Sequence, residues 1–389
     1  MIHTENFKTK TILLERENPA RGNRWNIGLD IGYSAVKGFS PNSIYCFPAF
    51  AKKVPEGLVN VAKARDKDIQ YRNSRTGEVW HVGEAAQDMC NTNDSELAIF
   101  GRQRYFSEMF QVIAEVGLAF GMLKNKFGAR GDKELFVQTG LPPEYREMDS
   151  DDLIEALSGE HNFEVKIGAR DWIPFQFTLK KENIGVPMDQ PMGTLYSVAC
   201  RGDGRPSKDA SKYFNSNVLI MDAGFGTLDI YNISNGKIIT KPETIDTMAM
   251  KEIFKRTIAD IAKMHKKEIS ITGMQRVLAT GTINVMEKKM VNGRKKRFSS
   301  EVGFSDYLEK NNKDVCIEAL DRICNTYDGL VDHKYLIITG GTCSAWNSII
   351  REYLAGMQTL AIVSGAENEN LSPVFANARG YYMFALSSR

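Results

Sequence analysis

Hydrophobic positions along the chain gather into short apolar runs that alternate with longer segments of helical spacing. The first run, residues 25–32 (WNIGLDIG), has the pattern of a buried strand entering a glycine turn, and residues 34–40 return as a second strand. Residues 217–234 repeat this plan of strand, glycine turn and strand. We therefore expect the two halves of the chain to begin with related hairpins.

The remaining pattern predicts strands that alternate with helices in both halves. Further strands are expected on both sides of a polar turn within 71–81, at 134–140, in a β-ribbon over 161–187, and at 334–341. Helices are expected at 104–126, from 192, at 248–265, at 304–327, from 344 and from 377. This alternation predicts an α/β architecture with two related domains.

The length of the chain also favours two domains. At 389 residues it exceeds the size at which a single hydrophobic core stops growing, and ligands tend to bind in the cleft between domains. Residues 1–24 are polar and include a breaker cluster at 18–23, so we expect a flexible N-terminal arm and a fold that starts near Trp25. The expected organisation is domain I at 25–190, domain II at 191–370, and a C-terminal helix at 371–389 that returns to domain I.

Composition excludes several other classes of protein. Hydrophobic residues make up 42% and charged residues 25%, and 50 basic against 48 acidic side chains give a net charge of +2, so neither disorder nor a wholly nucleic-acid-binding surface is indicated. The six cysteines are dispersed without a CxxC pair, which argues against a zinc site or a disulfide framework. No apolar stretch approaches the roughly 20 residues of a membrane span. We expect a cytoplasmic protein without a membrane partner.

The two glycine turns carry the first candidate chemistry. Phosphate groups need backbone N–H donors at close range, and glycine lets the chain approach closely. The first turn spans Asp30–Lys37 and the second spans Asp222–Asp229. Either turn alone is equally consistent with an ordinary β-hairpin, but two copies favour a phosphate site. The candidate binding residues in these turns are Asp30, Gly32, Tyr33, Ser34, Lys37, Gly224, Phe225, Gly226 and Thr227.

Each turn begins with an aspartate at the end of an apolar strand. Two such carboxylates, Asp30 and Asp222, would repel a triphosphate and each other unless a magnesium ion with its water shell lay between them. The sequence therefore predicts a Mg²⁺ site at these two residues, held through water.

A third glycine element follows the strand at 334–341. The pair Gly340-Gly341, with Thr342 next to it, would let a ribose or a flat ring lie against bare backbone, although a tight strand-to-helix turn explains it equally well. The chain contains neither GxxxxGK[ST] nor a GxGxxG strand-to-helix turn, so the common nucleotide motifs are not supported.

The order of phosphate turn, phosphate turn and glycine pair resembles the nucleotide motifs of the superfamily of actin, heat-shock chaperones and sugar kinases. Within it the chain most resembles ParM and related bacterial and archaeal actin-like proteins. This likeness is carried by Thr139–Pro142 (TGLP), Met188–Pro191 (MDQP) and Ala376–Gly380 (ANARG), and extends from about Trp25 to the C-terminus. The resemblance implies an actin-like, duplicated ribonuclease H-like fold with the nucleotide in the cleft between two domains.

The resemblance also implies roles for individual residues. Asp30 and Asp222 would hold the hydrated magnesium ion, and Lys37 with the two glycine turns would hold the phosphates of ATP or GTP. Gln190 matches the position that orients the attacking water, and its neighbour Asp189 is the alternative for that role. The implied catalytic set is therefore Gln190, Asp189 and Asp222.

The function implied is that of a nucleotide hydrolase that polymerises into filaments, which segregate plasmid DNA through an adaptor protein bound to the plasmid centromere. Two alternatives remain open. A small-molecule kinase of the same superfamily would need a catalytic carboxylate near an acceptor pocket, and none is identified. A chaperone-like nucleotide-gated module would need a separate substrate domain, for which the chain lacks room.

A basic run at 288–297 surrounds an Asn-Gly turn and therefore predicts the tip of a hairpin or loop. Its charge is explained either by a solvated surface or by contact with an acidic partner, a neighbouring protomer or DNA phosphates.

Overall fold

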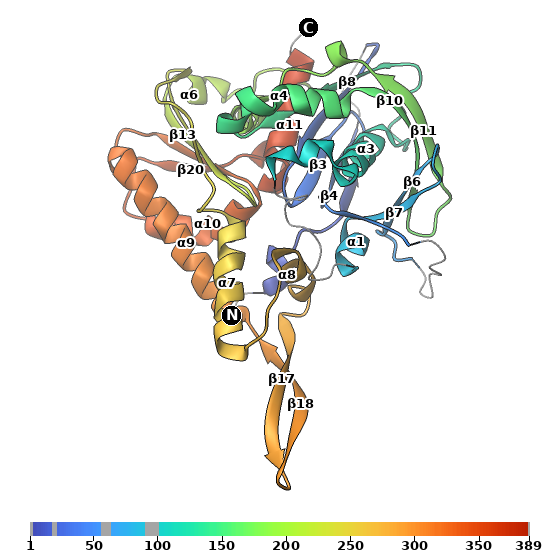
Figure 1. Ribbon diagram of the computed structural model, residues 1–389. Coiled ribbons are helices and arrows are strands. Elements are labelled where there is room, and N and C mark those ends of the chain that lie inside the picture. The colour runs from blue at the N-terminus through green and yellow to red at the C-terminus, as the bar shows by residue number, and fades with distance from the viewer. Residues whose placement is uncertain (1–2, 18–21, 56–63, 90–100, 388–389) are drawn as a thin grey trace.

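The computed structural model describes residues 3–17, 22–55, 64–89 and 101–387. These residues form two halves, each built around a β-sheet with helices packed against it, and a long two-stranded hairpin projects from one end (Figure 1). The central strands of both halves are the two hairpins expected from the sequence. The α/β class with two related halves is thus confirmed.

The first half contains a five-stranded sheet in the order β1-β4-β3-β2-β8. Strands β2 and β3 form the first hairpin, and β8 lies parallel to β2 on its other side. The strands are β1 Ile12–Glu15, β2 Arg24–Ile31, β3 Ala35–Phe39, β4 Ser43–Pro48 and β8 Glu134–Gln138.

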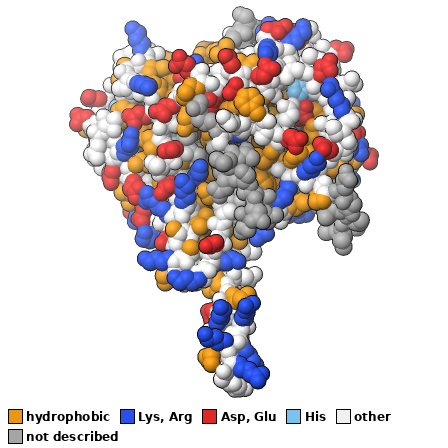
Figure 2. Space-filling view, viewed as in Figure 1, with side chains coloured by type: hydrophobic (Ala, Val, Ile, Leu, Met, Phe, Trp, Pro, Cys, Tyr) orange, Lys and Arg blue, Asp and Glu red, His pale blue; other side chains and the backbone are white. Residues whose placement is uncertain are grey.

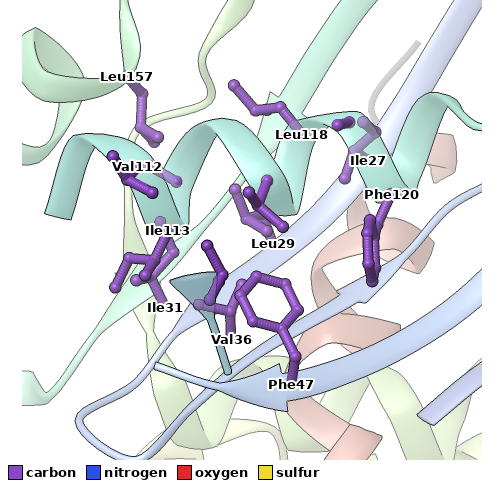
Figure 3. Packing of buried hydrophobic residues seen from close by; sticks show 14 of the residues in the cluster. Ile27, Leu29, Ile31, Val36, Phe47, Val112, Ile113, Leu118, Phe120 and Leu157 are labelled. Carbon is purple, nitrogen blue, oxygen red and sulfur yellow. The ribbon is translucent and has the colours of Figure 1, made fainter. Parts of the chain in front are cut away.

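Helix α3 (Glu108–Met122) covers one face of this sheet. Leu29 and Val36 are fully buried there against the helix, together with Phe120 (Figure 3). Because side chains alternate between the two faces of a strand, Asp30 and its cross-strand partner Lys37 lie on the opposite face. Burial of the apolar face under α3 therefore sets the direction of both charged groups.

A second sheet of the first half has the order β11-β10-β6-β7-β5. It confirms the strands on both sides of the turn within 71–81 and the β-ribbon over 161–187. Helix α4 (Pro143–Leu157) was not expected, because its sequence has almost no apolar periodicity. The other elements are β5 Ala51–Lys53, β6 Ile69–Asn73, β7 Val79–Val82, β10 Gly159–Ile167, β11 Ile173–Leu179, α1 Glu84–Asp88 and η2 Arg102–Phe106.

The second half repeats the arrangement of the first. Strand β13 pairs antiparallel with β14 and parallel with β19, as β2 pairs with β3 and β8. The sheet has the order β15-β14-β13-β19-β20, with β16 also paired to β14. The elements are β13 Asn217–Ala223, β14 Leu228–Ser234, β15 Lys237–Ile238, β16 Glu243–Ile245, β19 Tyr335–Thr339, β20 Ala361–Ser364, α7 Met250–His265, α8 Ile271–Val277, α9 Ser305–Thr326, η4 Asp328–Leu330 and α10 Gly341–Tyr353.

Helices α5 (Gln190–Ala199) and α11 (Ala376–Ser387) pack against each other between the two halves. Gly380 meets the backbone of Gly193 so closely that a side chain at residue 380 would overlap it. This glycine contact brings the start of α11 next to the ends of the central strands. Shorter elements in the same region are β9 Gly140–Leu141, β12 Met188–Asp189, η3 Lys181–Asn183, α6 Ala210–Phe214, η5 Glu367–Glu369 and η6 Pro373–Phe375.

The projecting hairpin consists of β17 (Thr282–Val291) and β18 (Arg294–Gly303). Asn292 and Gly293 have φ of 52° and 73°, as a two-residue hairpin turn with two positive φ angles requires. The prediction of a hairpin tip within the basic run is confirmed.

The expectation that the fold starts near Trp25 is wrong. Strand β1 pairs with β4 at the edge of the first sheet, and the 3-10 helix η1 (Thr4–Phe7) precedes it. Phe7 is buried in the core of the second half. The sequence concealed this strand because it is four residues long and most of it is exposed. Part of the breaker cluster, 18–21, lies outside the described residues.

Within the described part of the chain, no helix has both the length and the apolar character needed to span a bilayer.

Candidate functional site

A cavity of about 320 Å³ lies between the two halves. Pockets that bind small molecules usually enclose about 300–1,000 Å³, so this volume suits a small ligand. Both glycine turns line the cavity, one from each sheet, and the glycine pair of α10 lines it as well. Of the residues proposed from the sequence, all but Asp189 are on its wall: Asp30, Gly32, Tyr33, Ser34, Lys37, Gln190, Asp222, Gly224, Phe225, Gly226, Thr227, Gly340, Gly341 and Thr342.

In the first turn, the Lys37 ammonium donates a hydrogen bond of 2.6 Å to Asp30 Oδ2. Asp30 is only 1% exposed. Burial is the largest single influence and lowers the pKa of Lys37, but the charge and hydrogen bond of Asp30, with smaller contributions from Cys46 and Asp222, together raise it by more. The net shift is upward, so Lys37 stays charged. The turn thus presents a positive charge and a buried carboxylate to the cavity.

Arg104, which precedes α3, fixes the shape of this turn. Its guanidinium donates to the carbonyl oxygens of Ile31, at 2.6 Å, and Gly32, at 3.0 Å. It also stacks 4.5 Å from the centre of the Tyr33 ring. With its carbonyls held by Arg104, the turn keeps a defined shape for binding at the cavity wall.

In the second turn, Asp222 is the next-to-last residue of β13 and is 3% exposed. Burial, and then the charge of Asp30, raise the pKa of Asp222 from its usual value of 3.8 to about 6, while a hydrogen bond from Asn377 and the charge of Lys37 oppose that rise. Asn377 Nδ2 donates to Asp222 Oδ2 at 2.6 Å, and Thr194 Oγ1 donates to Asn377 Oδ1 at 2.8 Å. The crossing helices α5 and α11 therefore hold this carboxylate in place.

Asp229 lies directly across the β13-β14 ladder from Asp222, outside the cavity wall. Burial, followed by the charge of Asp222, raises its pKa well above the usual value. Thr227 Oγ1 donates to Asp229 Oδ2 at 3.2 Å. A carboxyl group therefore supports the second turn from behind.

The glycine pair at the start of α10 closes the third side. Gly340 has φ of 87°, and a Cβ there would lie 2.7 Å from Asp222 Oδ1 and would overlap the Ala223 carbonyl. Thr342 Oγ1 donates to the Gly224 carbonyl at 2.5 Å. Only glycine fits at residue 340, and the start of the 13-residue helix α10 faces the cavity, where N–H groups favour anions.

The two candidates for orienting water differ in their surroundings. Gln190 is the first residue of α5 and lines the cavity. Asp189 is engaged elsewhere: Arg146 Nε lies 2.7 Å from its Oδ1, and the Tyr231 hydroxyl donates to its Oδ2. The geometry brings Gln190, and not Asp189, to the cavity.

The residues present fit a hydrated magnesium ion. Asp30 Oδ1 is buried without a hydrogen-bond partner, although it lies in a cavity-lining residue. Magnesium prefers oxygen ligands and usually keeps several waters. In the described ranges no cluster of three or more His, Cys, Asp and Glu side chains occurs that would form a complete protein cage. Two carboxylates, one of which has an oxygen without a hydrogen-bond partner, suit an ion held largely through water.

Several residues of the site were missed from the sequence. Asn377 belongs to the ANARG segment, whose recurrence in the family could have indicated it. Arg104 and the N-terminal segment offered no such signal, because an isolated arginine and a polar terminus are common at any surface.

The N-terminal segment, residues 4–12, contacts both halves, and its residues 5–10 and Ile12 line the cavity. Thr4 Oγ1 donates to the Leu278 carbonyl at 2.8 Å, and Phe7 packs into the core of the second half. On the other side, the Thr11 N–H donates to Glu84 Oε1 at 2.6 Å. This segment therefore ties the two halves together at the cavity.

Comparison with known proteins agrees with this architecture. The chain matches, with a TM-score of 0.68 and 17% identity, the "pCBH ParM non-polymerisable quadruple mutant", and, with 0.67 and 16%, a 15-stranded ParM filament from Clostridium botulinum. It also matches Ta0583, an archaeal actin homologue in complex with ADP, with 0.59 and 17%. Each match covers 94% of this chain and all of the other.

The chain thus has an actin-like fold, as the resemblance in sequence implied. Residues 28–180 match the family described as "Actin like proteins N terminal domain". Comparison with curated protein sequences gives no match.

Proposed function

We propose that this protein binds ATP or GTP with magnesium in the cavity, hydrolyses it, and assembles into filaments that move plasmid DNA. The observation that carries the proposal is the meeting of two glycine turns, one from each half, around Lys37, Asp30 and Asp222. The ADP complex of an archaeal relative supports nucleotide binding, and the filament of a ParM relative supports self-assembly. The activity belongs in the cytoplasm, where nucleotides and plasmids are found.

In the proposed reaction the protein binds the nucleotide and orients the attacking water, and forms no covalent bond with the substrate. Lys37 and the backbone N–H groups of the two turns bind phosphate oxygens, and Asp30 and Asp222 would hold the magnesium ion through its waters. Bound magnesium offsets the charge that spreads over the phosphate oxygens. Gln190 orients the attacking water, and because an amide is a poor base, turnover is slow.

Hydrolysis is coupled to assembly through the two turns. The terminal phosphate contacts both, so its loss weakens the link between the halves and changes how the cleft closes. Neighbouring subunits in a head-to-tail array sense that change where they touch, and such an array grows as a filament when its rotation does not close. An adaptor on centromeric plasmid DNA would connect the filament to its cargo.

Right-angle light scattering tests the proposal, with phosphate release followed in parallel after magnesium and ATP, GTP or a non-hydrolysable analogue are added. A nucleotide-dependent rise that decays as phosphate appears is expected. Hydrolysis without any rise over a wide range of protein concentration would contradict filament formation and favour a kinase or a chaperone-like module.

Gln190→Ala is expected to lower the rate of hydrolysis by about 100-fold while nucleotide-dependent assembly persists and lasts longer. The cause is loss of the group that orients water, while the phosphate-binding groups stay intact. Asp189→Asn is the matched variant and should lower the rate of hydrolysis by less, because Arg146 and Tyr231 hold that carboxylate away from the cavity. Phosphate release measured on both variants decides the assignment, and a larger loss for Asp189→Asn would reverse it.

Phe7→Ala is expected to speed the release of bound nucleotide by about 10-fold. Phe7 anchors the N-terminal segment in the core of the second half. Removal of this buried aromatic side chain weakens the binding of the segment to the core by several kcal/mol. The segment therefore detaches from the cavity more often. Release of a fluorescent ADP analogue, chased with excess ADP, measures the effect. Leu13→Ala, on the exposed part of β1, serves as the control, and equal release rates for both variants would show that the segment does not retain nucleotide.

A further inference from the structure

The hairpin of β17 and β18 is a surface that the proposed function does not use. Its strands are ten residues long, about 33 Å at 3.3 Å per residue. The base is anchored in the core of the second half by Ile283 and Val285, and the outer part projects from the body (Figure 1). From Met286 to Phe298 every side chain is exposed or half-exposed. A two-stranded ribbon standing alone in water is marginally stable, so its outer half gains little from folding by itself.

The outer half of the hairpin is strongly basic. Between Met286 and Phe298 it carries six cations against the single acid Glu287, a net charge of +5 (6 − 1), and basic side chains cluster at its tip in Figure 2. Lys288 lies directly across the ladder from Arg297, and Lys289 lies across from Lys296. Like charges in such pairs destabilise a ribbon. These cross-strand pairs are unfavourable unless an anionic partner neutralises their charge.

The cations occupy both faces of the ribbon. Because side chains alternate along a strand, the register places three cations on each face. Lys289 has an exposed ion pair with Glu287, at 2.7 Å, which is weak and readily exchanged. A flat protein surface would meet one face of the ribbon and leave the other charged face unpaired. The cations are Lys288, Lys295 and Arg297 on one face, and Lys289, Arg294 and Lys296 on the other.

We propose that the hairpin binds double-stranded DNA by entering a groove, with its two basic faces against the phosphates of the two walls. The major groove, about 12 Å wide, admits a two-stranded β-ribbon, and phosphates line both its sides. Met286 and Met290, exposed beside the cations, would contact sugar and base edges. Such binding is driven by charge and is independent of sequence.

Further cations support this assignment. Helix α7 ends at the same end of the molecule as the base of the hairpin (Figure 1), and its last turn and the residues after it expose Lys263, Lys266 and Lys267. A duplex lying along the hairpin would pass these lysines. The chain would thus contact DNA itself, in addition to any contact made by an adaptor.

The test is fluorescence anisotropy of a labelled 24-base-pair duplex of random sequence, titrated with the full chain without nucleotide at several salt concentrations. The test variant replaces Lys288, Lys289, Lys295 and Lys296 with Ser. The control replaces Lys180, Lys208, Lys237 and Lys241, which are exposed and remote in sequence from the hairpin, so that the net charge falls equally.

The wild-type chain should bind with an affinity that falls steeply as salt rises. The hairpin variant should bind at least about 30-fold more weakly near 0.1 M salt, and its salt slope should be smaller by about 0.9 for each DNA phosphate that the hairpin no longer neutralises. The control variant should bind nearly as the wild type does.

Two results of the DNA titration would overturn the proposal: no binding by the wild-type chain at low salt, or equal losses of affinity in the two variants. A third would be a hairpin variant that binds DNA as the wild type does but loses nucleotide-dependent light scattering. The last result would assign the hairpin to contact with a second copy of the chain. Because DNA binding is measured without nucleotide, its outcome is separate from that of the proposed hydrolysis and assembly.

Discussion

Asp222→Asn is expected to lower magnesium-dependent hydrolysis by about 1,000-fold or more without loss of folding. The carboxylate is a proposed ligand of the hydrated ion, and several kcal/mol of transition-state stabilisation depend on that ion. Asparagine has nearly the same side-chain volume as aspartate, and its oxygen can still accept the hydrogen bond from Asn377. Phosphate release at saturating magnesium measures the loss.

The same variant should be more stable than the wild type when magnesium and nucleotide are absent. The pKa of Asp222 is raised in the folded protein to about 6, so between pH 4 and 6 the folded state binds a proton that the unfolded chain releases. The free energy of unfolding therefore falls as pH rises through this window. Above pH 6 the buried charge lowers it by its full amount, about 3 kcal/mol. Asp222→Asn removes that cost and flattens the pH dependence.

Urea unfolding of the magnesium-free protein at pH 4.5 and pH 7.5 checks this second effect. Asp171→Asn, at an exposed position, is the matched control and should change neither hydrolysis nor the pH dependence. If Asp222→Asn unfolded more easily than the wild type at pH 7.5, the carboxylate would have a structural role in place of the proposed one.

The glycine turns could be found from the sequence because their chemistry is local. A strand, an aspartate and a glycine turn are adjacent residues, so each turn can be recognised from a short stretch of sequence, and the ladder of β2 and β3 then places Lys37 directly across from Asp30. The repeat of this plan near Asp222 then predicted a shared site, and both turns do line one cavity. Local geometry repeated twice was enough to predict the fold class.

The parts that the sequence concealed depend on contacts between distant segments. Asn377 contacts Asp222, a residue 155 positions away, and that contact depends on how α11 crosses α5. Likewise, Phe7 is buried by residues of the second half, and nothing near it in the chain indicates this. Asp189 and Gln190 are neighbours in sequence, and the contacts of Asp189 with Arg146 and Tyr231 distinguish their surroundings.

The close contact between α5 and α11 predicts a large loss of stability when a side chain is added at residue 380. Gly380 and Gly193 let the two helices touch through their backbones, and this contact positions Asn377, and through it Asp222. A side chain at residue 380 would overlap the Gly193 carbonyl oxygen, which cannot move without shifting α5. Since α5 and α11 lie between the two halves, such a shift disturbs both cores and the site together.

Gly380→Val is therefore expected to destabilise the protein by about 4 kcal/mol or more, or to prevent its folding, because overpacking against rigid backbone is among the most costly substitutions. Thermal unfolding of the nucleotide-free protein measures the effect, and Gly380→Ala provides a milder variant if the valine variant is not recovered. Gly356→Val is the control, because a side chain there meets no atom within 4 Å. A melting temperature of Gly380→Ala close to that of the wild type would mean that the two helices can separate freely, and that their contact does not hold Asp222 in place.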